Sequence, residues 1–481
     1  MNKIMNTLSC IMAIALCSAS CGKPAGPEKP ADPRSLTFSK TQISIPATGG
    51  TFSVEVNANF TYKVKTDAAW LTEKDLSNTS APVFQAESNE ISFDRTAKIR
   101  FTDVEDRYYF KEVTVTQLSN PDASIIINIV DKQATPETKA LLANLWAIAD
   151  RGWMFGHHDD LWYGRYWQNQ PGGSDTKAVC GDYPAVFSVD IAEIMDDRFA
   201  SGNNAIRRRV ILEARERGEV ILACAHLNNP KTGKDSWDNS SNEVVREILT
   251  PGSATRETYL SWLDRCAGFA LELKDSRGKL IPVIFRMFHE HTQNWSWWGT
   301  SCTSTSEFTQ LWRMTVEYLR DTKGVHNFLY AISPQMDGMY ADPKGRIQFR
   351  WPGDDWVDFL GMDCYHGSNN SAFISNLKAL EEVSIAKKKP CGVTEDGIEG
   401  FTRADYWSTY IVAPTEGRRI SMVTMWRNKY VGSNESDTHF YSVYPGHPSE
   451  NDFRKMYDLD RTFFSKDLPD MYSLPEGYEI K

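Results

Sequence analysis

The chain has 481 residues, which is long enough for two domains or for one large domain with an appendage. Hydrophobic residues make up 41% of it and aromatic residues 12%, a composition typical of a globular protein. The formal net charge is -10, and no basic run is long enough to neutralise several phosphates in a row, which argues against nucleic acid as a partner.

Residues 1–20 have the pattern of a secretory signal peptide. A positive tip at Lys3 precedes the apolar run Ile11–Leu16, which is too short to cross a membrane as a helix. Small residues come immediately before Cys21, an arrangement that resembles a bacterial lipoprotein cleavage site with Cys21 as the acylated residue. We therefore expect an exported outer-membrane lipoprotein, held to the membrane only by its N-terminal lipid, with a Pro-rich linker over residues 21–34. No acidic run follows Cys21, which favours the periplasmic face over the cell surface.

Six cysteines lie beyond the signal region, and they are Cys180, Cys224, Cys266, Cys302, Cys364 and Cys391. None of them forms a C-x-x-C pair, which argues against a zinc ribbon. Outside the cytoplasm some of them could form disulfides, and the sequence leaves the pairing open.

Residues 35–119 have the pattern of a small all-β domain of the Ig-like sandwich type. Short alternating segments are separated by Gly, Asn and Asp, and they are Ile43–Ile45, Thr51–Val56, Tyr62–Lys65, Lys98–Phe101 and Val113–Gln117. Together with the Ala69–Leu71 element, this segment resembles the BACON domain, a module common at the N-terminus of Bacteroidetes glycan-degrading proteins. The domain's name suggests carbohydrate binding, but a spacer is an equally good reading. Trp70 is expected in the core, and the sequence shows no cluster of exposed aromatic residues.

From residue 125 to residue 481 the pattern changes to alternating strands and helices. Thr135 and Pro136 open a helix, as a capping residue and a first-turn proline. Eight strand-like apolar runs follow, and they are Met154–Gly156, Ala185–Asp190, Val220–Ala225, Pro282–Phe288, Asn327–Ile332, Asp358–Met362, Pro390–Val393 and Ile420–Trp426. Eight β/α units predict a (β/α)8 TIM barrel, with an open doubly wound sheet as the alternative.

Nearly every one of these runs ends in polar residues. The segments are Gly156–Asp160, Asp190, His226–Pro230, His289–Glu290, Ser333–Pro334, Asp363–His366, Thr394–Asp396 and Trp426–Asn428. The active site of a barrel draws on the C-terminal ends of many strands, whereas an open sheet concentrates its ligand groups at one switch point. The pattern therefore favours the barrel and predicts a site at that end of it.

The fourth run carries the strongest signal for chemistry. It contains Arg286 and ends in His289 and Glu290, followed by the aromatic stretch Trp295–Trp298. A buried carboxylate beside His and Arg is costly unless it has a function, and the faces of indole rings stack on sugar rings. The stretch predicts a sugar-binding site with an acid in it; the alternative is a strand end capped by a salt bridge among ordinary core tryptophans.

A second carboxylate, Glu395, ends the seventh run. The fourth and seventh strands lie across the mouth of a barrel from each other, so Glu290 and Glu395 can converge on one substrate bond. Paired carboxylates hydrolyse a glycosidic bond by either of two routes, which differ in the separation of the carboxylates. The sequence leaves both routes open.

Three motifs, Arg286–Gly299, Trp351–Tyr365 and Thr394–Glu395, together resemble glycoside hydrolase family 26, the β-mannanases. The resemblance covers about residues 125–481. It implies retaining hydrolysis of β-1,4-mannosidic linkages in mannan, galactomannan or glucomannan, with Glu290 as general acid/base and Glu395 as nucleophile. The substrate contacts that it implies are His226, Arg286, His289, Trp295, Tyr365 and Trp426, and further candidates are His157, Trp162 and Trp298. Of these, His289 would orient Glu290, and Tyr365 would donate a hydrogen bond to the nucleophile.

Four residues depart from the family's usual pattern: His291, Gln293, Ser296 and Asp396. We expect them on the subsite walls, where they bear on the substrate subtype more than on the reaction. Open alternatives are a mannobiose-releasing exo-enzyme and a xylan or β-glucan hydrolase of the same family.

Readings from other classes are a metal-dependent hydrolase and a catalytically silent glycan-binding lipoprotein. The first rests on histidines at strand ends, but His157 and His158 are adjacent and point to opposite faces of their strand, which disfavours shared metal ligation. The second conflicts with the presence of both carboxylates. We therefore expect no metal or other cofactor, a β-mannan substrate and a monomer.

Overall fold

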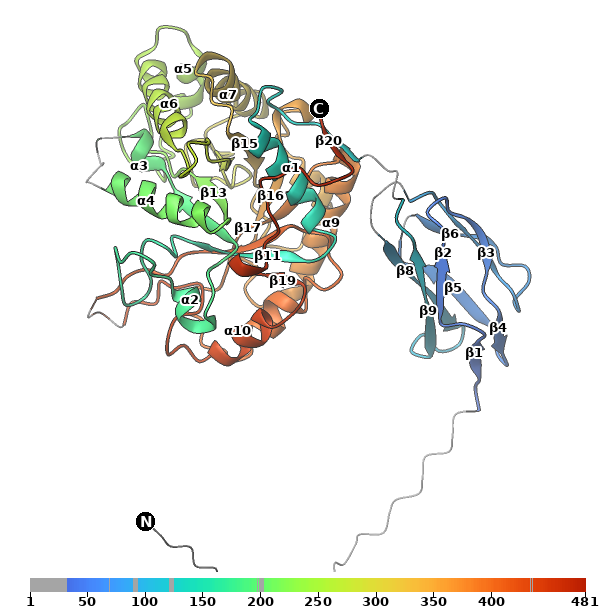
Figure 1. Ribbon diagram of the computed structural model, residues 1–481. Coiled ribbons are helices and arrows are strands. Elements are labelled where there is room, and N and C mark those ends of the chain that lie inside the picture. Colours follow the sequence, from blue (N-terminus) through green and yellow to red (C-terminus); the bar gives the residue numbers. More distant parts are fainter. Residues whose placement is uncertain are drawn as a thin grey trace, which may run out of the picture. The chain divides into compact units, whose positions relative to one another are not determined.

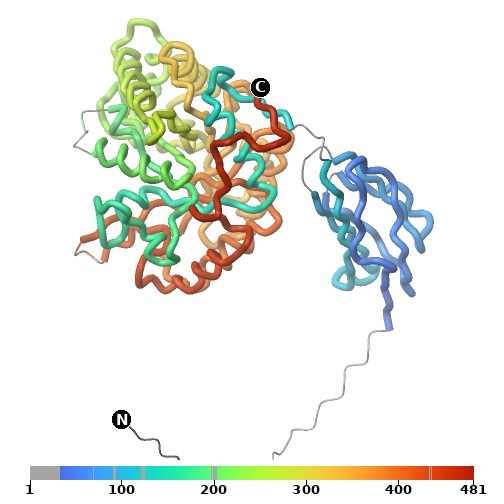
Figure 2. The backbone as a smooth tube through the Cα atoms, in the orientation of Figure 1, coloured from blue at the N-terminus to red at the C-terminus, as the bar shows by residue number. Residues whose placement is uncertain are grey.

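The chain divides into two compact units, Met1–Pro121 and Asp122–Lys481 (Figure 1). The structure is a computed structural model that describes residues 33–68, 70–89, 94–120, 125–196, 198, 203–432, 434 and 436–481. The expected signal peptide and Cys21 lie outside the described residues. Figure 2 shows the path of the backbone, with the smaller unit formed by the earlier part of the chain.

The smaller unit is all-β, as predicted. One sheet has the order β2 (Gln42–Ile45), β9 (Phe110–Gln117), β8 (Arg95–Asp103) and β5 (Tyr62–Thr66), and a second has the order β3 (Gly50–Ser53), β7 (Val83–Ala86) and β6 (Leu71–Asp75). Strands β1 (Leu36–Phe38) and β4 (Val56–Ala58) form an antiparallel pair. Alternate residues of β8 and β9 are fully buried between the sheets and form the core with Leu71 and Phe84.

The division of one predicted strand and the position of Trp70 differ from the sequence expectation. The run Thr51–Val56 is divided between β3 and β4, because the N–H groups of Val54 and Val56 bond to Pro82 and Ser80 outside the sheet ladders. The side chain of Trp70 is only partly buried, and the guanidinium of Arg95 lies 4.5 Å from the centre of its ring. Trp70 thus covers the edge of the core instead of lying inside it.

The larger unit is a closed (β/α)8 barrel, which confirms the predicted fold. Its parallel strands are β11 (Trp153–His158), β12 (Val186–Asp190), β13 (Val220–Cys224), β14 (Val283–Arg286), β15 (Phe328–Ile332), β16 (Phe359–Asp363), β17 (Cys391–Asp396) and β18 (Met422–Met425). Strand β11 pairs with both β12 and β18, so the sheet closes on itself. Nearly every residue of these strands is buried, because the barrel interior lies on one side and helices on the other.

Helices surround the barrel (Figure 1), and they are α1 (Pro136–Ile148), α2 (Asp175–Cys180), α3 (Ala192–Met195), α4 (Asn203–Glu216), α5 (Val244–Leu249), α6 (Ala254–Glu272), α7 (Thr305–Glu317), α8 (Pro343–Ile347), α9 (Asn370–Lys387) and α10 (Glu450–Tyr457). The side chain of Thr135 caps α1, as predicted, by accepting a hydrogen bond from the N–H of Thr138. Short strands β10 (Ile125–Ile127) and β20 (Tyr478–Ile480) pair in parallel, and β19 (Thr462–Phe463) pairs with the start of β11.

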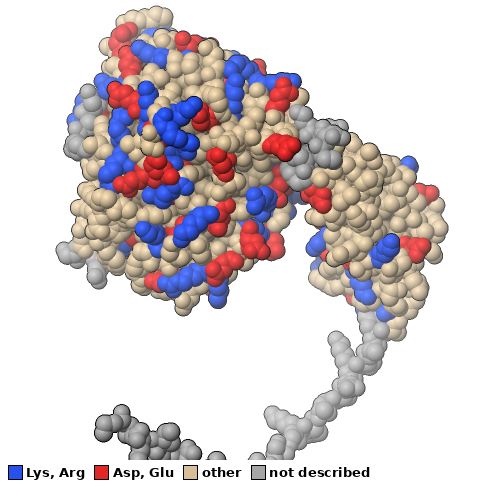
Figure 3. Space-filling view, in the orientation of Figure 1, with Lys and Arg blue, Asp and Glu red and all other residues tan. Residues whose placement is uncertain are grey.

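The charged side chains, the cysteines and the helix lengths can now be compared with the predictions from the sequence. On the face drawn in Figure 3, basic and acidic side chains are interspersed. The six cysteines in the described part of the chain are free thiols, and all but the half-buried Cys180 are buried. Among the described residues, no helix combines the length and the apolar character needed to span a membrane.

Candidate active site

Glu290 lies just beyond the C-terminal end of β14, in a turn with unusual backbone. Phe288 and Glu290 both have left-handed backbone angles, with φ of 50° and 52°. A non-glycine residue in this region costs about 1–2 kcal/mol, so the turn is held by other contacts. One of them is the hydrogen bond from the N–H of Glu290 to the carbonyl of Ser333, at 2.8 Å. The turn therefore fixes the position of the Glu290 side chain at the mouth of the barrel.

Three carboxylates converge at this position. Glu395 belongs to β17 and Asp363 to the end of β16, and one oxygen from each of Glu290, Asp363 and Glu395 lies within 4.8 Å of the others. All three side chains are buried. The strand order that placed Glu290 and Glu395 across the barrel mouth from each other thus brings their carboxylates together.

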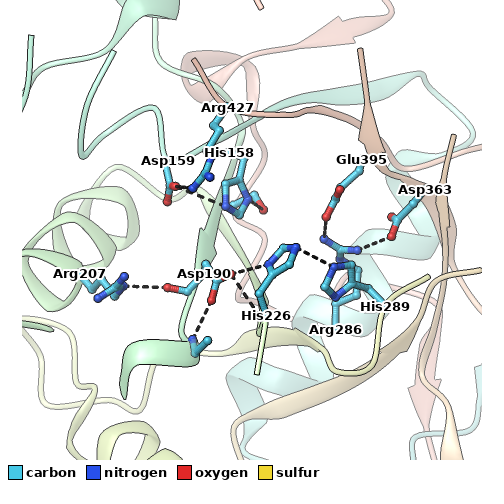
Figure 4. A network of polar contacts seen from close by, with 12 residues as sticks. His158, Asp159, Asp190, Arg207, His226, Arg286, His289, Asp363, Glu395 and Arg427 are labelled. Atoms are coloured by element: carbon cyan, nitrogen blue, oxygen red, sulfur yellow. Dashed lines mark hydrogen bonds and ion pairs between the residues drawn. The ribbon is translucent and has the colours of Figure 1, made fainter. Parts of the chain in front are cut away.

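Arg286 compensates the negative charge beneath the site (Figure 4). Its Nη1 donates a 2.6 Å hydrogen bond to Asp363, and its Nη2 donates to Oε1 of Glu395. The hydroxyl of Tyr365 donates to the other oxygen of Glu395 at 2.7 Å. Both oxygens of Glu395 therefore accept hydrogen bonds, as expected of an ionised carboxylate. Arg286 itself is fully buried and does not line the cleft, so it supports Glu395 and does not make the sugar contact that the sequence suggested.

Glu290 has a different environment. The indole N–H of Trp295 donates a 2.6 Å hydrogen bond to its Oε2. Burial raises the pKa of Glu290 well above its usual range, and the negative charges of Glu395 and Asp363 raise it further. The surroundings thus favour the protonated form of Glu290, whereas Glu395 accepts hydrogen bonds from a guanidinium and a hydroxyl group. This is the arrangement expected of an acid next to a nucleophile.

A chain of polar groups runs from β12 to the turn after β14. Nδ1 of His226 lies 2.6 Å from the carboxylate of Asp190, and Nε2 of His226 lies 3.0 Å from Nε2 of His289. Burial, followed by the positive charges of His226 and Arg286, lowers the pKa of His289 well below its usual value. His289 is therefore neutral, and its contact with His226 fixes the orientation of its ring (Figure 4). His289 immediately precedes Glu290 in the sequence.

A cleft of about 1090 Å³ opens above these groups at the C-terminal ends of the barrel strands. The predicted site residues that line it are Trp162, His226, His289, Glu290, Trp295, Tyr365, Glu395 and Trp426. Two further candidates are not brought to the cleft. Nδ1 of His157 lies 3.1 Å from the carboxylate of Asp160, and Trp298 is fully buried, with its indole N–H bonded to the carbonyl of His289.

Of the four departures from the family pattern, only Gln293 lines the cleft. His291 is buried against Phe308, with ring centres 4.8 Å apart, and its Nε2 bonds to the carbonyl of Phe349. Ser296 and Asp396 are fully buried. The expectation that all four stand on the subsite walls is therefore wrong, because the turn and the strand direct three of them into the protein.

Several residues that line the cleft were not singled out by the sequence. Trp237, in the loop after β13, is 63% exposed, and its ring centre lies 4.5 Å from that of Trp295. Asp337 accepts hydrogen bonds from the N–H of Tyr365 and the side chain of Gln335, and burial raises its pKa to about 6. An isolated Trp in a polar loop was the available signal for Trp237; no pattern marked Asp337.

Two groups of described residues have the composition of metal ligands: the three carboxylates, and Asp190 with Cys224 and His226. In the first group the guanidinium of Arg286 already supplies the positive charge that a cation would bring. His157 and His158 contact opposite sides of β11. His157 faces Thr176, whereas His158 bonds to Ser188 and stacks on Trp426. The two histidines do not share a ligand position.

Replacement of Arg286 by methionine should destabilise the protein strongly. The change leaves Asp363 and Glu395 buried without their cation, and breaking a buried ion pair in this way costs about 3–5 kcal/mol. Urea unfolding monitored by circular dichroism measures the loss. In the control variant Arg208→Met, the broken pair with Glu272 is exposed, and the cost should stay below about 1 kcal/mol. Equal losses in the two variants would contradict the role given to Arg286.

Comparisons with known proteins agree with this geometry. A family model described as glycosyl hydrolase family 26 matches residues 130–397. A mannan endo-1,4-beta-mannosidase from Bifidobacterium adolescentis is 31% identical over 378 residues, which cover 73% of this chain and 37% of the relative. One from Thermothelomyces thermophilus is 24% identical over 54% of this chain and 51% of the relative. The chain therefore spans about half or less of the length of these two curated relatives.

Solved structures are similar over almost their whole length. A family 26 β-mannanase from Bacteroides ovatus is 39% identical, with a TM-score of 0.67, and the match covers 71% of this chain and 98% of that one. The catalytic domain of an endo-β-1,4-mannanase from Bacillus sp. JAMB-750 is 28% identical, also with a TM-score of 0.67, and covers 75% of this chain and 98% of that one.

Proposed function

This chain belongs to glycosyl hydrolase family 26, and from that membership we propose that it hydrolyses β-1,4-mannosidic linkages in mannan, galactomannan or glucomannan with retention of configuration. The observation that carries the mechanism is the approach of Glu290 and Glu395 oxygens to within 4.8 Å. Retaining enzymes hold their carboxyl groups about 5 Å apart, whereas inverting enzymes need about 6.5–9.5 Å to admit a water molecule. The names of the curated relatives support mannan as the substrate.

In the first step, an oxygen of Glu395 attacks the anomeric carbon as the bond to the leaving sugar breaks. Glu290 gives its proton to the departing glycosidic oxygen, and a covalent glycosyl ester forms on Glu395. Arg286 and Tyr365 hold Glu395 by one oxygen each, which fixes the carboxylate for attack. Positive charge that develops on the sugar ring is stabilised by the carboxylates around it.

In the second step, water displaces Glu395 from the anomeric carbon. Glu290, now ionised, accepts a proton from the attacking water and so returns to its starting state. The product has the anomeric configuration of the substrate, and both carboxyl groups are restored. The indole N–H of Trp295 stabilises the charged form of Glu290 between the two steps.

The pH dependence of kcat/KM should report the acid. Because burial and the neighbouring carboxylates raise the pKa of Glu290, it keeps its proton to higher pH than an ordinary glutamate, and activity should fall as pH rises through that pKa. The Trp295→Phe variant loses a donor to the ionised form, so its alkaline limb should move to higher pH. Initial rates on a mannooligosaccharide between about pH 5 and 10 measure the alkaline limb of the wild type and of the variant. A limb that shifts to lower pH would contradict the assignment.

The direct test of retention is proton NMR of freshly released sugar. The β-anomer should appear first and then equilibrate with the α-anomer. Initial release of the α-anomer would rule out Glu395 as nucleophile, and no release from mannan at all would refute the proposed activity.

Product profiles on β-1,4-mannan, galactomannan, xylan and mixed-linkage glucan test the substrate, and we expect an early spread of mannooligosaccharides. Mannobiose alone from the first minutes would instead identify a chain-end enzyme.

We further propose that the chain is exported, acylated at Cys21 and active as a monomer at the outer membrane, with the BACON-like unit as a spacer. The signal pattern and the small residues before Cys21 support the tether. Metabolic labelling with palmitate should mark the wild-type chain and leave the Cys21→Ser variant unlabelled. Recovery of unlabelled wild-type chain in the cytoplasm would refute this placement.

A further inference from the structure

The turn between β8 and β9 carries a cluster of exposed hydrophobic side chains. Val104 is 51% exposed, Phe110 is 42% exposed, and Tyr108 is 75% exposed, which makes it the most exposed large hydrophobic side chain among the described residues. We call these three residues the tip. The sequence had shown no exposed aromatic cluster in this unit, so the tip corrects that expectation.

Contacts made by Arg34 fix the conformation of the turn that carries the tip, and we call Arg34 and its partners the base. The guanidinium of Arg34 bonds to the carboxylates of Asp103 and Asp106 at 3.1 and 3.0 Å, and it lies 4.2 Å from the centre of the Tyr109 ring. The hydroxyl of Tyr109 in turn donates to the carbonyl of Arg34. Because Tyr109 points inward to this base, its neighbours Tyr108 and Phe110 are directed outward.

These contacts also place the tip at the end of the unit where the chain enters it. Arg34 stands 13 residues after Cys21, and 13 residues span at most about 45 Å. Strand β9 then runs from Phe110 away from the tip to Gln117, so the chain leaves the unit at the opposite end. A lipid on Cys21 would therefore join the membrane to the tip end of the unit, and the tip lies within reach of the membrane surface.

The residues beside the tip have the character of a membrane interface. Exposed Arg107 lies over the ring of Tyr108 at 4.8 Å, and exposed Lys111 follows Phe110. Among the nearby acids, Asp103 and Asp106 share the cation of Arg34, Glu112 pairs with Arg100, and Glu105 in the same turn is exposed, so basic and acidic side chains both flank the aromatic rings. Aromatic rings with adjacent basic side chains are the groups that partition to the headgroup region of a bilayer.

We propose that the tip inserts its aromatic side chains into the headgroup region of the membrane to which Cys21 is tethered. It is a second membrane contact, made by protein, that orients the β-sandwich unit on the lipid surface. This proposal rests on the lipid tether proposed above and is independent of the hydrolase activity. Neither the tether alone nor a spacer role requires exposed aromatic residues at this end.

The first test uses the lipidated full chain in vesicles of phosphatidylethanolamine and phosphatidylglycerol. A polarity-sensitive fluorophore is attached to the Tyr108→Cys variant and, as the matched control, to Leu118→Cys, which replaces a 45% exposed side chain just beyond the other end of β9. The probe at position 108 should shift to shorter wavelength and be quenched by brominated lipid, whereas the probe at position 118 should behave as in water. Equal, water-like emission from both probes on vesicle-bound protein would overturn the proposal.

Separate readouts distinguish the tether from the tip. Absence of palmitate label on the chain refutes the tether, whatever the probes report. For the tip alone, flotation of the mature chain with Cys21→Ser, which carries no lipid, should show weak vesicle binding that falls at least about fivefold in the Tyr108→Ser/Phe110→Ser variant and is unchanged in Leu118→Ser. Retardation of the unlipidated chain by soluble glucomannan, lost in the same double variant and without vesicle binding, would show that the tip binds glycan and would refute the membrane contact.

Discussion

The Glu395→Ala variant should lose kcat on β-1,4-mannan by a factor of about 10⁴ or more. Without this carboxylate no covalent ester can form at position 395, and Arg286 and Tyr365 lose the oxygens that they hold in place for attack. Initial rates of reducing-sugar release measure the loss. Circular dichroism should confirm that the barrel remains folded, since Arg286 keeps its buried ion pair with Asp363.

Glu399 provides the matched control, because it lies four residues further along the chain and its side chain is half exposed. The Glu399→Ala variant should retain activity within a factor of about three, since a surface carboxylate contributes little to the reaction. A small anion such as azide should restore turnover in Glu395→Ala and yield a glycosyl azide of inverted configuration. Full activity of Glu395→Ala together with inactivity of Glu399→Ala would transfer the nucleophile role to Glu399.

The Glu290→Gln variant should lower kcat on mannan by about 10²–10⁴, because the leaving sugar then departs without a proton. The loss should be much smaller on an aryl β-mannobioside with an acidic phenol, which leaves as a stable anion. The ratio of the two losses is the diagnostic measurement. Asp337 is the rival acid, since it also lines the cleft and its pKa is raised to about 6. Leaving-group dependence in Asp337→Asn but not in Glu290→Gln would reverse the assignment.

The same variant should change stability in a pH-dependent manner. The pKa of Glu290 is raised in the folded protein above the unfolded value of about 4.3, so the folded state binds the proton more tightly. The free energy of unfolding therefore falls as pH rises between these two pKa values and is constant above both. Glu290→Gln carries no charge to bury, and it should be more stable than the wild type in urea at pH 8. Equal stability at pH 8 and pH 4 in both proteins would contradict the raised pKa.

The barrel and its two central carboxylates could be predicted because their signals are local. Each strand is an apolar run followed by polar residues, and counting the runs places Glu290 and Glu395 across the barrel mouth from each other. Arg286 could be identified from the sequence as a site residue, but its role could not be predicted. Its position on β14 does not reveal that its guanidinium lies beneath the cleft and bonds to two carboxylates. Asp337 and Trp237 lie in loops, whose conformation depends on tertiary contacts that no periodicity encodes.

In the smaller unit, too, the features that depend on tertiary contacts could not be predicted from the sequence. Its all-β character follows from alternation, but β6 was missed because four of its five residues are exposed and only Leu71 is buried. The tip was missed for a related reason. Tyr108, Tyr109 and Phe110 are consecutive aromatic residues, and only the pairing of Tyr109 with Arg34 decides which of them face outward.

The left-handed backbone at Phe288 and Glu290 also bears on how this sequence can diverge. Glycine and asparagine suit such a conformation best, while β-branched residues are strongly disfavoured. At position 290, selection for folding alone would thus favour residues that cannot donate the proton. Among homologues that no longer need hydrolase activity, Gly or Asn should therefore replace Glu at position 290 early. A homologue that keeps Glu there, against the backbone preference, should still be under selection as an enzyme.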